Sequence, residues 1–261
     1  MRPANVLILG NSHISAPRAA LVSQPERWPG FEAATFGMPG GSLRHLDLKG
    51  GELVPRDART RRVMRFFNHV TRLPLIGYDG FVVVGGLSFA SLISLVLDHR
   101  SLDFPSVQAG ASCDLISAGL VAAMVRQRIE GSVAMQVVRL LHRLDQGPVL
   151  FLPEPLVSAD CRTDLDAQEL TLALAQTGDG GHFRQLVLRQ MRQHFAGLAT
   201  LLEQPQDSIV DEVFTDGALM RGSIRMTFRD EVPHEGTDYA HANAAFGAMQ
   251  LDQIVQGFAA L

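Results

Sequence analysis

The stretch NVLILGNSHISAPRAAL, residues 5–21, decides how the rest of the chain is interpreted. Its apolar run, residues 6–9, ends in a glycine, which is typical of a short strand buried on both faces. Pro17 then suits the first turn of a helix. Ser12 and His13 therefore stand between a strand and a helix, where they either cap the turn or present a nucleophile.

Short apolar runs alternate with helical patterns along the whole chain. We expect strands over residues 6–9, 31–36, 81–84, 149–152 and 209–214. We expect helices over residues 17–23, 60–71, 89–98, 112–129, 132–144, 164–202 and 243–259, with a possible break of the helical pattern of residues 164–202 at Gly178–Gly181. This alternation predicts an α/β fold, a three-layer α/β/α sandwich around a central, mostly parallel, five-stranded sheet. We expect one domain over residues 1–261, with ligands bound beyond the carboxyl ends of the strands.

The composition excludes several classes of protein. Hydrophobic residues make up 46% of the 261 positions and charged residues 19%, as in an ordinary globular protein. A net charge of −4 provides no basic field for a nucleic acid, so we expect no nucleic-acid partner. We find neither a signal peptide nor an apolar stretch long enough to span a membrane, and we expect a cytoplasmic protein. Cys113 and Cys161 match no metal-binding or redox spacing.

Three common glycine motifs are absent after the first strand. The G-x-S-x-G elbow of the α/β-hydrolases fails because Ile14 stands where its second glycine would be. Neither a dinucleotide-binding GxGxxG nor a phosphate-binding GxxxxGK follows. We therefore expect no nucleotide and no other cofactor.

A second polar cluster lies near the end of the chain, in DEVPHEGTDYAHANAAFG, residues 230–247. Asp238 and His241 are close enough in sequence for the carboxylate to orient the imidazole as a general base. The same two residues could instead cap the closing helix. Together with His234 and Glu235 they offer metal ligands, but the HExxH spacing is not met, and we expect no metal.

Taken together, Gly10-Asn11-Ser12 after the first strand and Asp238-Tyr239-Ala240-His241 near the C-terminus resemble the SGNH, or GDSL-type, hydrolases. That family places its serine in a Gly-Asp-Ser stretch and its histidine in Asp-x-x-His. The resemblance implies a flavodoxin-like sheet, with Ser12 as nucleophile, His241 as base and Asp238 as its partner. It also implies an oxyanion hole formed by Ser12 and by Gly40, the best match within GMPGGSL, residues 37–43.

Two departures from the family pattern stand out. Asn11 replaces the usual aspartate, which is nearly isosteric, so we expect the change to be tolerated. The family's Gly-x-Asn after the third strand is Gly86-Leu87-Ser88 here, so the asparagine donor is missing. Either the Ser88 hydroxyl or a backbone N–H would have to replace it.

Other residues beside these motifs carry no family signal. We expect His13 to flank the nucleophile sterically or through a local hydrogen bond. Arg44 and His45 follow the oxyanion loop and either contact a substrate or are simply exposed basic residues. The helical segment of residues 102–144 matches no part of the family pattern.

The resemblance implies a serine esterase acting on small acyl esters, including O-acetyl groups on carbohydrate. Two alternatives remain open at this stage. An O-acyltransferase would use the same triad and pass the acyl group to a sugar hydroxyl. A binding protein would keep the fold without turnover, and the missing asparagine leaves this alternative open. The expected partner in each case is a small-molecule ester.

Overall fold

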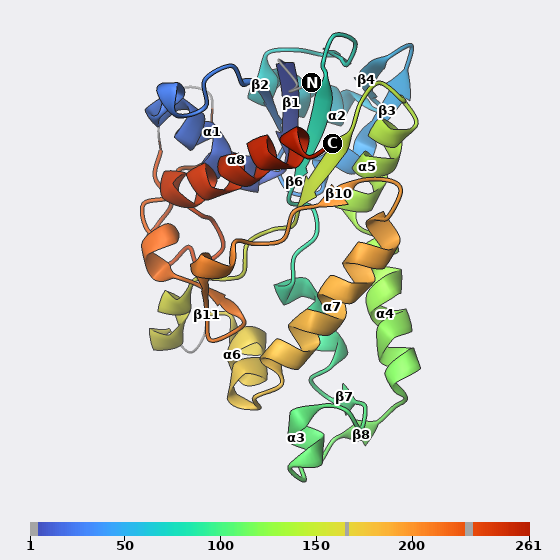
Figure 1. The fold of residues 1–261 in the computed structure, drawn as a ribbon, viewed down its shortest axis with the longest axis vertical. Coiled ribbons are helices and arrows are strands. Elements are labelled where there is room, and N and C mark those ends of the chain that lie inside the picture. Colours follow the sequence, from blue (N-terminus) through green and yellow to red (C-terminus); the bar gives the residue numbers. More distant parts are fainter. Residues whose placement is uncertain (1–4, 165–166, 228–231) are drawn as a thin grey trace.

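The computed structural model describes residues 5–164, 167–227 and 232–261 (Figure 1). Its centre is a five-stranded sheet in the order β10-β9-β6-β1-β2, in which every neighbouring pair is parallel. The strands are β1 (Asn5–Gly10), β2 (Glu32–Gly37), β6 (Gly80–Val84), β9 (Val149–Leu152) and β10 (Thr200–Leu201). The predicted α/β fold with a parallel five-stranded sheet is confirmed.

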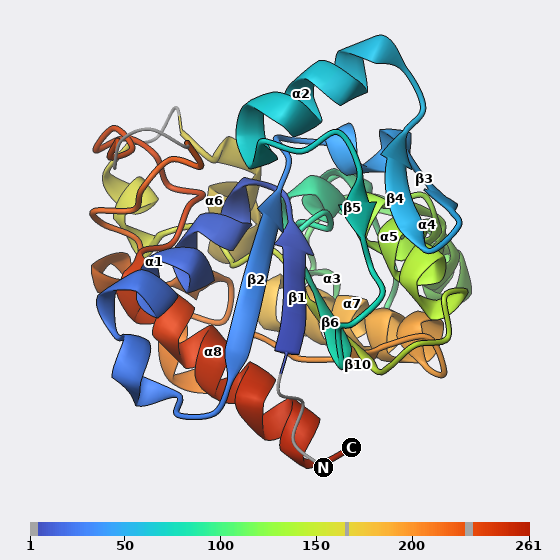
Figure 2. The ribbon, with the colours of Figure 1, turned by 90° about the horizontal axis from the view of Figure 1, so that it is seen from above.

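Both faces of the sheet are covered, because successive side chains of a strand point to opposite faces. Val6 and Ile8 pack under α1 (Ser15–Ser23) and α8 (Ala244–Ala259). Leu7 and Leu9 belong to the larger cluster on the other face, which includes α2 (Ala58–Asn68) and α5 (Val133–His142). Figure 2 shows α8 and α1 on one side of the sheet and α2 and α5 on the other. Three layers result.

A small antiparallel sheet lies outside the central one, beside α2 (Figure 2). Its strands are β3 (Leu46–Lys49), β4 (Glu52–Pro55) and β5 (Leu73–Pro74). It follows the loop of residues 38–45 that comes directly after β2. The N–H of Arg56, directly after β4, donates to His45 O at 2.9 Å, so the sheet contacts the segment in which the sequence predicts an oxyanion donor.

In the described part of the chain, four helices and two short strands lie beyond the carboxyl ends of the central strands (Figure 1). The helices are α3 (Pro105–Gln108), α4 (Ala118–Glu130), α6 (Glu169–Gln176) and α7 (Gly180–Phe195), and the strands are β7 (His99–Arg100) and β8 (Asp114–Leu115). A buried ion pair ties them together: Arg100 Nε lies 3.0 Å from Asp179 Oδ2, and Ser106 donates its N–H and Oγ–H to the same carboxylate at 2.8 and 2.6 Å. Most of residues 102–144, the segment that matches no family pattern, is therefore a packed extension beyond the carboxyl ends of the strands.

The fifth strand differs from the one predicted. The predicted break in the helical pattern of residues 164–202 is present, because Gly178, at φ +74°, separates α6 from α7. The pattern also ends earlier than predicted: Gly197, at φ +75°, follows α7, and the chain returns to the sheet as β10. Residues 209–214, predicted as the last strand, instead form β11 (Ile209–Val210) and β12 (Phe214–Thr215), an antiparallel pair outside the central sheet. The left-handed turn at Asp211 and Glu212, at φ 43° and 65°, reverses the chain between them.

Two predicted helices also differ. Residues 89–98 contain the short 3-10 helix η4 (Ala90–Leu95), and residues 112–117 precede α4, whose first turn is capped by the Ser117 side chain. Among the described residues, no helix has both the length and the apolar character needed to cross a bilayer.

Candidate active site

Ser12 lies directly after β1, at the point where the central sheet ends. The N–H of Asn11 still donates to Val84 O of the neighbouring β6, at 3.3 Å. Ser12 then begins the short 3-10 helix η1 (Ser12–Ile14), which Asn11 caps by accepting the N–H of His13 at 3.2 Å. Within the described parts of the chain, the Ser12 N–H has no acceptor, so it is available to a ligand.

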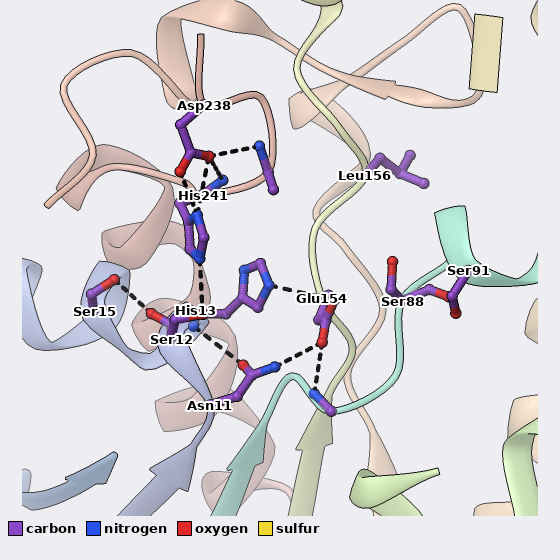
Figure 3. Close-up of polar contacts among 12 residues, drawn as sticks. Asn11, Ser12, His13, Ser15, Ser88, Ser91, Glu154, Leu156, Asp238 and His241 are labelled. Atoms are coloured by element: carbon purple, nitrogen blue, oxygen red, sulfur yellow. Dashed lines mark hydrogen bonds and ion pairs between the residues drawn. The ribbon is translucent and has the colours of Figure 1, made fainter. Parts of the chain in front are cut away.

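His241 and Asp238 reach Ser12 from the loop that precedes α8 (Figure 3). The Ser12 Oγ lies 2.8 Å from His241 Nε2, and His241 Nδ1 lies 2.9 and 3.0 Å from the two carboxylate oxygens of Asp238. The tautomer that carries its proton on Nδ1 leaves Nε2 free to accept the serine proton. The structure thus brings together three residues that are up to 229 positions apart, in the order needed to activate a hydroxyl.

The loop itself holds Asp238 in place as an anion. One carboxylate oxygen accepts the backbone N–H groups of Ala240 and His241, at 2.9 and 3.0 Å. Burial alone raises the pKa of Asp238, but these hydrogen bonds and the adjacent His241 outweigh burial and lower it. His234 Nδ1 lies 2.6 Å from the other oxygen, a contact that sequence reasoning did not predict.

His241 is sandwiched between two other imidazoles. The rings of His234 and His241 are stacked with centroids 4.2 Å apart, and those of His13 and His241 with centroids 4.8 Å apart. Burial lowers the pKa of His241, and the charge of His13 lowers it further, against the raising effect of Asp238. His241 is therefore neutral, and able to act as a base, at neutral pH.

Glu154 is a further acidic residue of the site, and sequence reasoning missed it. Its Oε1 accepts Asn11 Nδ2 at 2.8 Å and the Gly86 N–H at 3.0 Å, and its Oε2 lies 3.4 Å from His13 Nε2 (Figure 3). Burial raises the pKa of Glu154, but the contacts with His13, Asn11 and Gly86 outweigh burial and lower it to about 2. Its position between Pro153 and Pro155, just after β9, was the available signal, because ligand-site residues gather where parallel strands end.

The predicted oxyanion residues lie in different places. Gly40 is exposed, with φ at +51°, a conformation that favours glycine, and its N–H has no acceptor among the described residues. Ser88 lies on the far side of Glu154 from Ser12 in Figure 3, where its carbonyl accepts the Ser91 hydroxyl at 2.7 Å. The Gly86 N–H is already used by Glu154. Ser12 and Gly40 therefore offer free N–H donors, and Ser88 forms no hydrogen bond with Ser12 among the described residues.

The same loop also carries a set of potential metal ligands. One ligand atom from each of His234, Asp238 and His241 lies within 4.8 Å of the others. In the arrangement described, Asp238 contacts both imidazoles directly, and His241 also contacts Ser12. The expectation that the site uses no metal stays a prediction.

Comparison of the chain with protein-family models and with curated proteins gives no match in either case. The kind of chemistry assigned to this site therefore has to be inferred from its residues and their geometry alone.

Proposed function

We propose that this protein is a serine esterase of the SGNH type, which hydrolyses small acyl esters through an acyl-enzyme. The observation that carries the proposal is the unbroken chain of contacts from Ser12 Oγ through His241 to Asp238, with heavy-atom distances of 2.8 and 2.9 Å. If Asp238 and His241 only capped the closing helix, His241 Nε2 would need no contact with a serine hydroxyl. Nucleophilic catalysis needs this contact, with a carboxylate on the other imidazole nitrogen.

The reaction follows from these positions. Ser12 Oγ attacks the ester carbonyl carbon while His241 Nε2 takes its proton, and Asp238 stabilises the imidazolium that forms. The tetrahedral intermediate collapses, the C–O bond to the alcohol breaks, and His241 returns the proton to the leaving oxygen. Water then attacks the acyl-enzyme, with His241 again as base, and releases the acid and Ser12.

The negative charge that develops on the carbonyl oxygen needs donors that are free beforehand. The N–H groups of Ser12 and Gly40 meet this condition and form the proposed oxyanion hole. η1 begins at Ser12 and is followed directly by α1, which begins at Ser15, so the positive end of this helical segment also favours an anion there. Removing one donor of such a pair typically costs about 10²–10³ in kcat.

The arrangement of the sheet supports the same class. Counted along the chain, the five strands lie in the order 2-1-3-4-5, which is that of flavodoxin-like sheets. In such sheets the order reverses beside the first strand, and ligands bind beyond the carboxyl ends at that point. Ser12 follows β1, and Gly86 follows β6, its neighbour on the other side of the reversal.

The decisive experiment compares the protein with its Ser12→Ala variant, using a fluorophosphonate probe and 4-nitrophenyl acetate over about pH 6–9, where a histidine base is mainly neutral. We expect covalent labelling at Ser12, and a loss of at least about 10³-fold in hydrolysis in Ser12→Ala. Ser23→Ala, which changes an exposed serine at the end of α1, is the matched control. Absence of both labelling and hydrolysis in the unchanged protein would overturn the proposal and leave the binding-protein alternative.

The same assay separates hydrolysis from acyl transfer, because both pass through the acyl-enzyme and differ only in the second nucleophile. Added sugar hydroxyls should leave the yield of free acid unchanged if water is the acceptor. Acylated sugar formed at the expense of free acid would identify the O-acyltransferase instead.

A further inference from the structure

A cleft of about 810 Å³ is lined by Asn11, the residue before Ser12, and by Gly40 of the proposed oxyanion hole. Gly86, which follows β6, lines it as well. Residues of α4 and the segment Gly131, Ser132 and Val133, which leads into α5, also line it. The segment of residues 102–144, which matches no family pattern, therefore forms a wall of the space that an ester bound to Ser12 would enter.

Three charged side chains line this cleft: Arg44, Arg128 and Glu154. Glu154 is committed to protein groups, since its oxygens contact Asn11, Gly86 and His13. Arg44 and Arg128 are exposed, and neither forms an ion pair with any residue that the structure describes. The charge that the cleft offers to a ligand is therefore positive.

Arg44 lies close to the loop that carries Gly40, the proposed oxyanion donor. A Cβ atom added at Gly41 would lie 3.5 Å from Arg44 Nε and 3.8 Å from Cζ, so the side chain folds back over the loop next to Gly40. Arg44 also lines an adjoining cleft of about 520 Å³, together with Arg56, Arg139 and Arg143, and no carboxylate lines it. Arg139 is paired with Glu130, while Arg56 and Arg143 make no ion pair with the described residues.

This positive region is local, because the whole chain carries a net charge of −4. A neutral acyl ester would make no use of two unpaired guanidinium groups beside the nucleophile. A carboxylate or phosphate would, because guanidinium binds these oxyanions through charge-assisted, often bidentate, hydrogen bonds. We infer that the ester bound at Ser12 carries an anionic group, which Arg44 and Arg128 hold in this cleft. The inference rests on the proposed esterase function.

The test compares matched esters that differ in charge. 4-Nitrophenyl hemisuccinate and 4-nitrophenyl butyrate place a charged or a neutral end on the acyl side. 4-Acetoxybenzoate and its methyl ester place the charge, or its neutral equivalent, on the alcohol side. We expect a higher kcat/KM for the charged member of one pair, and the pair that shows the preference locates the anion. The preference should weaken as salt is added, because exposed charges are screened.

Arg44→Gln and Arg128→Gln test the two arginines directly. We expect each to lower kcat/KM for the preferred charged ester by about five- to tenfold and to change the value for its neutral partner by less than about twofold. Arg126→Gln is the matched control, since Arg126 is an exposed arginine on the same helix that does not line the cleft. Equal kcat/KM for charged and neutral esters, or equal effects of the Arg126 and Arg128 variants, would overturn the inference while leaving the esterase intact.

A binding measurement separates this inference from the proposed function. Ser12→Ala cannot form the acyl-enzyme, so its affinity for 4-nitrophenyl hemisuccinate and 4-acetoxybenzoate can be measured by calorimetry. We expect Arg44→Gln and Arg128→Gln, each combined with Ser12→Ala, to weaken binding of one of them by a similar five- to tenfold factor. If the unchanged protein hydrolyses none of the esters, such weakening would still support the anion site, while the esterase would be refuted. No effect of either arginine would refute the anion site.

Discussion

The imidazole of His13 is stacked on that of His241, with ring centroids 4.8 Å apart and planes inclined by 19°. Its Nε2 lies 3.4 Å from the half-buried carboxylate of Glu154. The histidine next to Ser12 is therefore a neighbour of the proposed base rather than a second base. Through His13, Glu154 is linked to the proposed triad.

We expect His13→Gln to raise the pH at which activity falls on the acid side. Burial and the charge of His13 both lower the pKa of His241, so in the unchanged protein kcat/KM should reach half of its maximum below pH 6.5, the ordinary histidine value. Glutamine keeps a donor for Glu154 but carries no charge, so the pKa of His241 rises. The measurement is the pH profile of kcat/KM. His142→Gln, at an exposed histidine, should leave the profile in place, and a profile that also stays in place for His13→Gln would contradict the prediction.

Asn11→Asp should destabilise the protein, although the two side chains are nearly isosteric. The Asn11 amide donates to Glu154 Oε1 at 2.8 Å, and an aspartate would set a second carboxylate against the first. We expect a loss of about 2–3 kcal/mol in the free energy of unfolding, measured by denaturant titration near neutral pH. The double variant Asn11→Asp with Glu154→Gln should recover at least half of this loss. Failure of the second substitution to rescue the first would show that charge repulsion is not the cause.

Glu154 should make stability depend on pH in the acid range. Its pKa is about 2 in the folded protein against an ordinary value of 4.5, so the stabilisation is complete above 4.5 and is lost as the pH falls towards 2. A shift of this size corresponds to about 3 kcal/mol. We expect Glu154→Gln to flatten the decline of the unfolding free energy over this range. Glu26→Gln, at an exposed glutamate, should keep the decline of the unchanged protein, and equal slopes in all three proteins would contradict the prediction.

Asp238→Asn and His234→Gln should differ sharply in their effect on turnover. Asp238 accepts from His241 Nδ1, and an amide there no longer holds the correct tautomer, so we expect a loss of about 10⁴ in kcat. His234 contacts Asp238 Oδ2 and one face of His241, while Asp238 keeps its backbone hydrogen bonds and its contact with His241 Nδ1, so replacement of His234 should cost less than about tenfold. The measurement is kcat with 4-nitrophenyl acetate. Losses of similar size would mean that His234 is as essential as Asp238.

Much of the fold could be predicted because the buried strands are locally encoded. Residues 6–9, 81–84 and 149–152 are continuous apolar runs, and each lies within a strand whose two faces are both covered. The fifth strand could not be predicted, since β10 has two residues and no pattern of its own. Its place comes from pairing with β9, and that partner is about 50 positions away.

The residues of the candidate site also fall into some that the sequence could predict and others that it could not. Ser12, Asp238 and His241 were predictable because residue type and short spacing describe their chemistry, although only folding brings the serine within 2.8 Å of the imidazole. Glu154 gave no comparable signal, since an isolated glutamate between two prolines is an ordinary surface pattern. The contact of Asn11 was equally hidden, because the residue that accepts its amide is Glu154, which lies far away in the chain.

By itself, the sequence determined the class of fold, the parallel strands at its centre and the three residues proposed to carry the chemistry. Each of these depends on local runs or short motifs. Only the tertiary structure decided which groups surround them: the histidines on either side of His241, the half-buried Glu154, and the two arginines of the cleft. Those contacts join segments far apart in the chain, and their energies depend on burial and on distances between charges, which exist only once the chain has folded.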